Sequence, residues 1–175
     1  MSAPSAEQKY VVRKGLNPWL LLVGLVAALG CMAGAILIPI MKGQGDSIGS
    51  DNCRNNLRQL ARASLLYASE NDDLLPGKNW DDSLLKQEPD EVVYACPVQR
   101  RLDPKSSGYA LSKDVAGKAL SKIVSHESEI LFFDSVVTEP GSLDDPSNLS
   151  QPPRHRKGSS NNIIFVDGHS AEVKK

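Results

Sequence analysis

The sequence lacks several features that would point to an enzyme or to a nucleic-acid-binding protein. It has no Cys-x-x-Cys pair and no phosphate-binding G-x-x-x-x-G-K-[ST] loop. Neither sign of charge predominates, because 20 Lys and Arg residues balance 21 Asp and Glu residues, and this balance disfavours nucleic acid as a partner. Aromatic residues form only 5% of the chain, so we expect a modest core. We therefore predict a structural or interaction protein without enzymatic activity.

Charged residues and histidine are absent from residues 16–41. A helix of this length, at about 1.5 Å per residue, exceeds the roughly 30 Å hydrocarbon thickness of a bilayer. We predict one transmembrane helix over 16–41. Three alternatives are disfavoured. A cleaved signal peptide has a shorter apolar core, acylation at Cys31 would leave further apolar residues at the start of the mature protein, and a buried core helix needs more surrounding chain.

The flanks of this run predict its orientation. Only Lys42 follows the run closely, whereas three basic residues precede it: Lys9, Arg13 and Lys14. Basic flanks favour the cytoplasmic side of a membrane. We therefore predict a cytoplasmic tail at 1–15, the transmembrane helix at 16–41 and an exported domain at 42–175.

Cysteine is scarce, and its three positions differ in meaning. Cys31 lies within the apolar run, which leaves Cys53 and Cys96 in the predicted exported domain. An oxidising compartment would permit a disulfide between these two residues. Cys53 and Cys96 are therefore a disulfide candidate, with two small buried thiols as the alternative.

The first part of the exported domain has a helical pattern. Ser50 or Asp51 can cap a helix, and small or apolar residues recur on one face at three- and four-residue steps as far as Ala68. We predict an amphipathic helix that ends near Asn71, before the Pro76-Gly77 turn.

Strand patterns follow in the second part. The segments expected to form strands are 91–97, 109–111, 130–133, 163–166 and 169–173. Asp167-Gly168 between the last two predicts a hairpin with a type I′ turn. Residues 138–161 are rich in Pro, Ser, Gly and Asn, which predicts a long loop. Because an amphipathic helix and a small antiparallel sheet can bury each other's apolar faces, we predict an α+β fold.

One grouping of side chains suggests chemistry. His155, Asp167 and His169 could form a metal or acid-base site if the hairpin brought them together. The turn explains Asp167 by itself, so we predict no catalytic and no metal site. The basic run at 154–157 suits phosphate or lipid headgroups, but we expect it to lie far from the membrane in a solvated loop.

Several blocks of the exported domain resemble one bacterial family. The blocks are Cys53-Arg54-Asn55-Asn56-Leu57-Arg58-Gln59-Leu60 with Tyr67, Asn71 and Pro76; Trp80 with Tyr94-Ala95-Cys96-Pro97; Tyr109-Ala110-Leu111; Leu131-Phe132-Phe133-Asp134-Ser135; and Arg154-His155 with Phe165-Val166-Asp167-Gly168-His169. In this order they resemble the prepilin-type H-X9-DG proteins, which are related to the pseudopilins of type II secretion. The positions that match the family signature are Asn56, Leu57, Gln59, Tyr67, Pro76, Trp80, Pro97, His155, Asp167 and Gly168.

The resemblance implies a pilin-like fold, whose long N-terminal helix has a membrane half and an amphipathic half packed on an antiparallel sheet. It implies a structural subunit of a type II secretion or type IV pilus-like assembly in the inner membrane of a bacterium, with a cytoplasmic N-terminus and a periplasmic or otherwise extracytoplasmic domain. Its partners would be other pseudopilins or the secretion or pilus machinery, together with the lipid bilayer. The alternative is a non-polymerising single-pass envelope protein whose pilin-like ectodomain is a binding module.

Two features depart from the family pattern. Eleven residues rather than nine separate His155 from Asp167. Family members begin the membrane helix with a Gly and a Glu-containing block, and prepilin peptidase cuts after the Gly, whereas here Leu20 stands in the place of the Glu. Cleavage between Gly15 and Leu16 is therefore disfavoured, and we predict an uncleaved anchor.

Calcium is the one cofactor that the resemblance suggests, because the major pseudopilins of type II secretion bind it in a loop. The carboxylates available for such a site are Asp72, Asp73, Asp81, Asp82, Asp144 and Asp145. Their spacing does not match an EF-hand, so solvated carboxylates are the preferred interpretation and we predict no bound cofactor.

Overall fold

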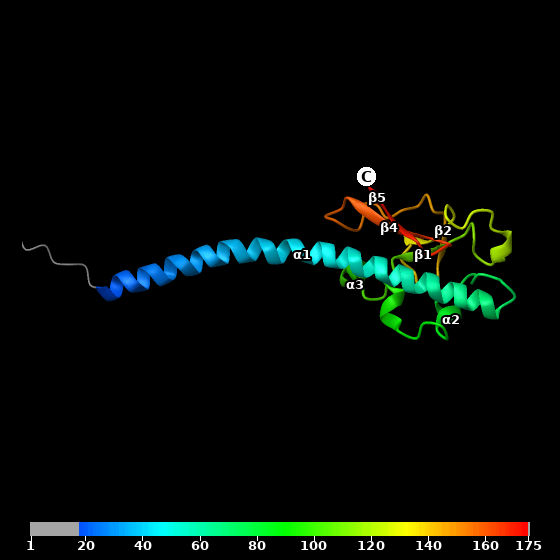
Figure 1. Ribbon diagram of the computed structural model, residues 1–175, viewed down its shortest axis with the longest axis horizontal. Helices are drawn as coiled ribbons and strands as arrows, with labels where there is room; N and C mark the ends of the chain where they lie inside the picture. Colours follow the sequence, from blue (N-terminus) through cyan, green and yellow to red (C-terminus); the bar gives the residue numbers. More distant parts are fainter. Residues whose placement is uncertain (1–17, 175) are drawn as a thin grey trace, which may run out of the picture. The chain divides into compact units, whose positions relative to one another are not determined.

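The structure is a computed structural model that describes residues 18–174. The predicted tail at 1–15, with the cleavage position at Gly15 and Leu16, lies outside the described residues. The chain falls into two compact units, Met1–Lys42 and Gly43–Lys175. Helix α1 (Pro18–Glu70) begins in the first unit and ends in the second (Figure 1).

The first unit contains the predicted membrane span. Apolar side chains described there are exposed, including those of Leu22, Val26 and Leu29. Within the part of the chain that the structure describes, no helix is long and apolar enough to cross a membrane. Some residues and side chains of 16–41 lie outside that part, and the span stays a prediction.

In the second unit, α1 buries one face. Its buried residues recur at the three- and four-residue steps predicted from the sequence: Cys53, Leu57, Leu60, Ala61, Ser64 and Ala68. The helix ends at Glu70, beside the predicted end at Asn71. Asp72 and Asp73 follow with φ values of 51° and 67°, which an α-helix cannot contain, and the chain turns away there.

The sheet has the strand order β3-β1-β2-β4-β5. Its strands are β1 (Tyr109–Ser112), β2 (Ile130–Asp134), β3 (Leu143–Asp144), β4 (Ser160–Phe165) and β5 (Ser170–Lys174). Neighbouring strands pair antiparallel except β3, which runs parallel to β1. The sheet is therefore mixed rather than antiparallel, because two residues of the predicted loop at 138–161 join its edge.

Strands β4 and β5 form the predicted hairpin, but the turn is not type I′. Of the turn residues only Gly168 has a positive φ, at 87°. The Gly168 N–H donates to Phe165 O at 2.9 Å, and the Phe165 N–H donates to His169 O at 3.0 Å. This pattern is a type I turn followed by a left-handed glycine, which is another common hairpin connection.

The predicted strand at 91–97 is wrong, because this segment forms helical turns. The short helices of the second unit are α2 (Trp80–Leu84), η1 (Glu91–Tyr94), α3 (Pro97–Leu102) and η2 (Leu120–Lys122). The Asp90 carboxylate caps η1 by accepting a hydrogen bond from the Val92 N–H at 3.0 Å. Pro97 begins α3, where its fixed φ and missing N–H are tolerated.

Trp80 lies in the core that α1 shares with the sheet, and its side chain is fully buried. Its ring meets Phe132 edge to face, with centroids 4.8 Å apart, and stacks at 6.1 Å on Tyr94. Its Nε1–H donates to Ser142 O at 2.9 Å. Trp80 therefore joins α2, β2 and the residue before β3 in one packed group.

Candidate functional site

Four buried side chains with reactive or ionisable groups form what we call the cysteine–histidine cluster: Cys53, Cys96, Asp134 and His155. Cys53 comes from α1, Cys96 precedes α3, Asp134 ends β2 and His155 lies before β4. No member is more than 1% exposed. The fold thus brings together four segments that are far apart in the sequence.

Short distances connect the members of this cluster. Cys53 Sγ lies 2.6 Å from Cys96 Sγ. His155 Nε2 lies 3.9 Å from Cys96 Sγ and 3.0 Å from Asp134 Oδ2. His155 therefore stands between a sulfur atom and a carboxylate.

Asp134 connects the cluster to the backbone of the sheet and to Arg154. Its Oδ2 accepts a hydrogen bond from the Asn162 N–H at 2.6 Å, and Arg154 Nη1 lies 3.6 Å from its Oδ1. The Arg154 guanidinium, whose side chain is only 5% exposed, donates to the carbonyl oxygens of Gly108 and Ser135. The contacts of Oδ2 with Asn162 and His155 replace part of the hydration that the buried carboxylate loses, while Oδ1 accepts no hydrogen bond among the described residues.

Burial and hydrogen bonding act in opposite directions on the pKa values of the cluster. Burial disfavours the imidazolium, but the hydrogen bond to Asp134 and the contact with Cys96 outweigh it and raise the pKa of His155 to about 9. Burial also opposes ionisation of Cys96, yet contacts with Cys53 and His155 lower its thiol pKa to about 5. Burial raises the pKa of the Cys53 thiol. If Cys53 and Cys96 are not bonded to each other, Cys96 is a thiolate beside a protonated His155.

Two cysteines and one histidine are also a zinc-binding set by residue type. The ligand atoms of Cys53, Cys96 and His155 all lie within 4.8 Å of one another. Two thiolates on a tetrahedral zinc ion, each at about 2.3 Å from it, would be roughly 3.7 Å apart. The separation of 2.6 Å is much shorter. The geometry therefore fits a bond between the sulfur atoms better than a shared metal ion, and the disulfide stays a prediction that this closeness supports.

The family-signature residues occupy mainly packing positions. Those with little or partial exposure are Asn56, Leu57, Gln59, Tyr67, Pro76, Trp80, Pro97, His155 and Gly168, while Asp167 is exposed in the hairpin turn. Asn56 Nδ2 donates to Ala95 O at 3.3 Å and Val92 O at 3.4 Å, which ties α1 to the segment before α3. Several signature residues therefore hold the helix to the rest of the domain.

The structure does not join His155 to Asp167 and His169. His169 Nδ1 lies 2.7 Å from Asp167 Oδ1 within the hairpin turn, whereas His155 pairs with Ser160 at the opposite end of β4. The partner of His155 that sequence reasoning missed is Asp134. Its only sequence signal was a carboxylate at the end of an apolar strand.

Two of the carboxylates considered for calcium, Asp144 and Asp145, are engaged by other side chains of the protein. Asp144 accepts hydrogen bonds from Ser135 Oγ at 2.5 Å and Asn148 Nδ2 at 2.8 Å, and Asp145 pairs with Lys113 at 2.7 Å. Among the described residues, these carboxylates do not converge on a common point with the other candidates.

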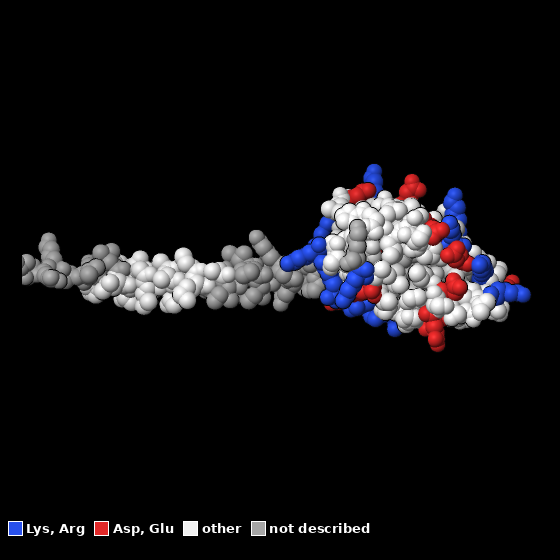
Figure 2. Space-filling view, turned by 90° about the horizontal axis from the view of Figure 1, so that it is seen from above, with Lys and Arg blue, Asp and Glu red and all other residues white. Residues whose placement is uncertain are grey.

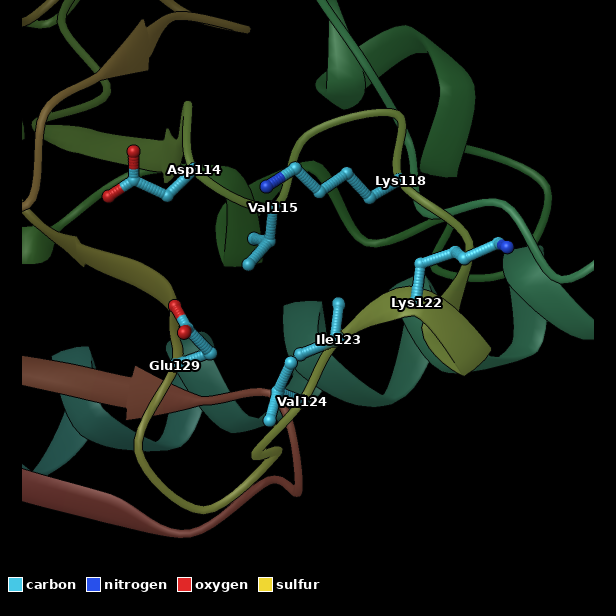
Figure 3. Close-up of a pocket in the computed structure, with 7 residues that line it drawn as sticks. All are labelled: Asp114, Val115, Lys118, Lys122, Ile123, Val124 and Glu129. Carbon is cyan, nitrogen blue, oxygen red and sulfur yellow. The ribbon is translucent and has the colours of Figure 1, made fainter.

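A hollow of about 340 Å³ lies beside the segment that follows α1. Figure 3 shows the side chains that line it: Asp114, Val115, Lys118, Lys122, Ile123, Val124 and Glu129. Two carboxylates and two ammonium groups around a small apolar patch do not favour one class of ligand.

One letter pattern in α1 resembles a hydrolase motif. Residues 45–49 read G-D-S-I-G, which fits G-x-S-x-G. They lie inside α1, whereas a nucleophilic serine of this type needs a sharp turn between a strand and a helix. The match therefore does not indicate a hydrolase.

Comparison of the chain with models of protein families, with curated proteins and with solved structures finds no match.

Proposed function

We propose that this chain is a membrane-anchored, pilin-like structural subunit of a type II secretion or type IV pilus-like assembly. Residues 16–41 would hold it in the inner membrane of a bacterium. The second unit would lie on the extracytoplasmic side, where it contacts other pseudopilins or the secretion or pilus machinery.

The observation that carries the proposal is the packing of α1 in the second unit. Beyond Ser50, α1 buries a face that includes Leu57 and Leu60 in the core that it shares with a five-stranded sheet. The preceding residues 16–41 are uncharged and apolar. An apolar helical half followed by a half packed on a sheet is the arrangement that the pilin resemblance implies.

The burial of the cysteine–histidine cluster favours a structural role over an enzymatic one. Cys53, Cys96 and His155 come from three different blocks of the resemblance, and each is at most 1% exposed. A catalytic group has to reach its substrate, and these side chains contact one another instead. Their arrangement suits residues that hold three segments together.

A second candidate is the non-polymerising binding module. It is favoured by Leu20, which stands where pilins have a Glu that pairs with a neighbour's N-terminal amine inside the bilayer. Without that pair, an assembly would lose a contact that sets the register between its subunits.

Oxidative cross-linking through Cys31 distinguishes the two candidates. Cys31 is exposed, whereas Cys53 and Cys96 are buried. If the apolar helices of neighbouring subunits pack together, copper phenanthroline should give disulfide-linked dimers of the full chain in native membranes. Cys31→Ala should give none.

The Cys31→Ala variant also serves as the background for a scan of the helix. Single cysteines are introduced at exposed positions: Val23, Val26, Leu29 and Met32. Dimers that recur with helical periodicity support the subunit. Monomers at every position, together with one partner captured by an amine cross-linker, support the binding module. Recovery of the full chain outside the membrane fraction contradicts both.

A further inference from the structure

Basic side chains gather at one end of the second unit (Figure 2). Four of them form what we call the basic collar: Arg54, Arg156, Lys157 and Lys174. All are exposed except Arg54, which is partly exposed. Asp51 pairs with Arg54 at 2.6 Å, and Glu172 pairs with Arg156 at 3.0 Å and lies 3.8 Å from Arg54. The two lysines have no acidic partner among the described residues, so the collar keeps an excess of positive charge.

The direction of β4 shows which end of α1 the collar occupies. Asn162 Nδ2 donates to Ser50 O at 3.5 Å, and Arg58 Nη2 donates to Ser170 Oγ at 2.8 Å. Ser170 pairs with Ile164, so β4 and α1 run in the same direction past each other.

Ser160, the first residue of β4, therefore extends past Ser50 towards lower residue numbers of α1. Lys174 pairs with Ser160, and Arg156 and Lys157 lie in the loop that precedes it. The collar thus lies where α1 enters the second unit. This place in the second unit argues against the expectation that the basic run lies far from the membrane.

The backbone of the collar loop is strained. Arg156 and Lys157 have φ values of 49° and 61° and precede Gly158 at 82°. A left-handed conformation costs roughly 1–2 kcal/mol at each residue other than glycine. Three successive N–H groups, from Gly158 to Ser160, donate to the His155 carbonyl oxygen at 3.0–3.2 Å and hold this shape. Strain that exposes an Arg and a Lys beside each other is typical of a functional surface.

We propose that the basic collar binds the anionic phosphate headgroups of the bilayer that holds α1. This inference rests on the membrane anchor of the proposed function. About nine residues connect Met41 to Ser50 and span roughly 14 Å as a helix. The headgroup layer extends about 5–8 Å beyond the hydrocarbon. A connection of this length lets the collar come within about one Debye length, roughly 8 Å, of the headgroups, where attraction is only partly screened.

The test uses the full chain in lipid nanodiscs. One set of discs contains phosphatidylcholine alone, and the other contains about one third phosphatidylglycerol. Lysines are acetylated with an N-hydroxysuccinimide ester, and mass spectrometry gives the rate at each position. The internal controls are Lys118 and Lys122, which line the hollow beside the segment that follows α1 (Figure 3).

Anionic discs should slow acetylation of Lys157 and Lys174 at least about threefold relative to neutral discs, and about 0.5 M NaCl should restore the rates. Lys118 and Lys122 should react equally in both. Two double variants test the assignment. Arg156→Gln with Lys157→Gln should weaken the protection of Lys174, whereas the same charge removal at Lys118 and Lys122 should leave it unchanged.

The outcomes separate the collar from the anchor. Equal acetylation of Lys157 and Lys174 in neutral and anionic discs overturns the proposal that the collar binds lipid headgroups. An acidic protein partner would then be the alternative ligand, and the membrane anchor would be unaffected by this result. A chain that does not enter the discs overturns the anchor and the collar proposal together.

Discussion

Reducing the predicted bond between Cys53 and Cys96 should lower the free energy of unfolding of the second unit by about 4 kcal/mol. The two residues are 43 positions apart in the sequence. A cross-link that closes a loop of about this length removes roughly 13 cal/mol/K of entropy from the unfolded chain, which is about 4 kcal/mol at 25 °C. The buried position of both sulfur atoms favours a bond that becomes reducible only on unfolding.

Urea unfolding measured by tryptophan fluorescence tests this prediction on the full chain. A Trp19→Phe background leaves the buried Trp80 as the single reporter, since the chain has two tryptophans. Reductant should move the unfolding midpoint to lower urea. Cys53→Ala should abolish the effect of the reductant, and Cys31→Ala should preserve it.

Alkylation in urea without reductant provides the refutation. If Cys53 and Cys96 both react under these conditions, and if reductant leaves the midpoint unchanged, the sulfur atoms are not bonded and the reasoning fails. Zinc that copurifies with the chain in a one-to-one ratio would assign the pair to a metal site instead.

Three further predictions concern the core and the cluster. Asp134→Asn removes the charge beside His155 and should cost about 3–5 kcal/mol in urea unfolding, whereas Asp167→Asn in the exposed turn should cost less than about 1 kcal/mol. In the reduced protein, where contacts with Asp134 and Cys96 raise the pKa of His155 from 6.5 to about 9 on folding, its protonation contributes up to about 3 kcal/mol that is fully present below pH 6.5 and is lost as the pH rises through 9. A stability profile that is flat from pH 6 to 9.5, or one that His155→Gln leaves unaltered, contradicts this. Trp80→Phe removes one of the two hydrogen bonds that Ser142 O accepts, the other coming from the Leu111 N–H, and should lower thermal stability by about 1–3 kcal/mol. An unchanged melting temperature would show that the hydrogen bond from Trp80 contributes nothing.

Local sequence patterns predicted the elements in which buried residues recur at regular steps along the chain. The spacing of Leu57 and Leu60 predicted the packed face of α1, and Asp167-Gly168 predicted the β4–β5 hairpin. The predicted strand at 91–97 was wrong, because the Asp90 cap and Pro97 favour helical turns over the strand that the apolar residues suggested. Strand β3 was missed because a strand of two residues is too short to show an alternation of apolar and polar residues. Its parallel pairing with β1 also depends on contacts between residues that are distant in the sequence.

The candidate site was predictable only in part for the same reason. Cys53 and Cys96 could be paired by elimination, because the third cysteine lies in the apolar run. Nothing in the sequence related His155 to Asp134, whose 3.0 Å contact is created by the alignment of β2 with the residues before β4. The position of the basic collar likewise depends on the direction of β4 along α1, which sequence order does not reveal.

His155 connects the interior of the domain to its basic surface. Its side chain is held by Asp134 and Cys96, while its carbonyl oxygen accepts the hydrogen bonds that close the loop at 156–159. The contacts of His155 therefore help to hold Arg156 and Lys157 in their strained conformation. In this arrangement the buried cluster does more than stabilise the core, since it also fixes where two cations project from the end of the domain that α1 enters.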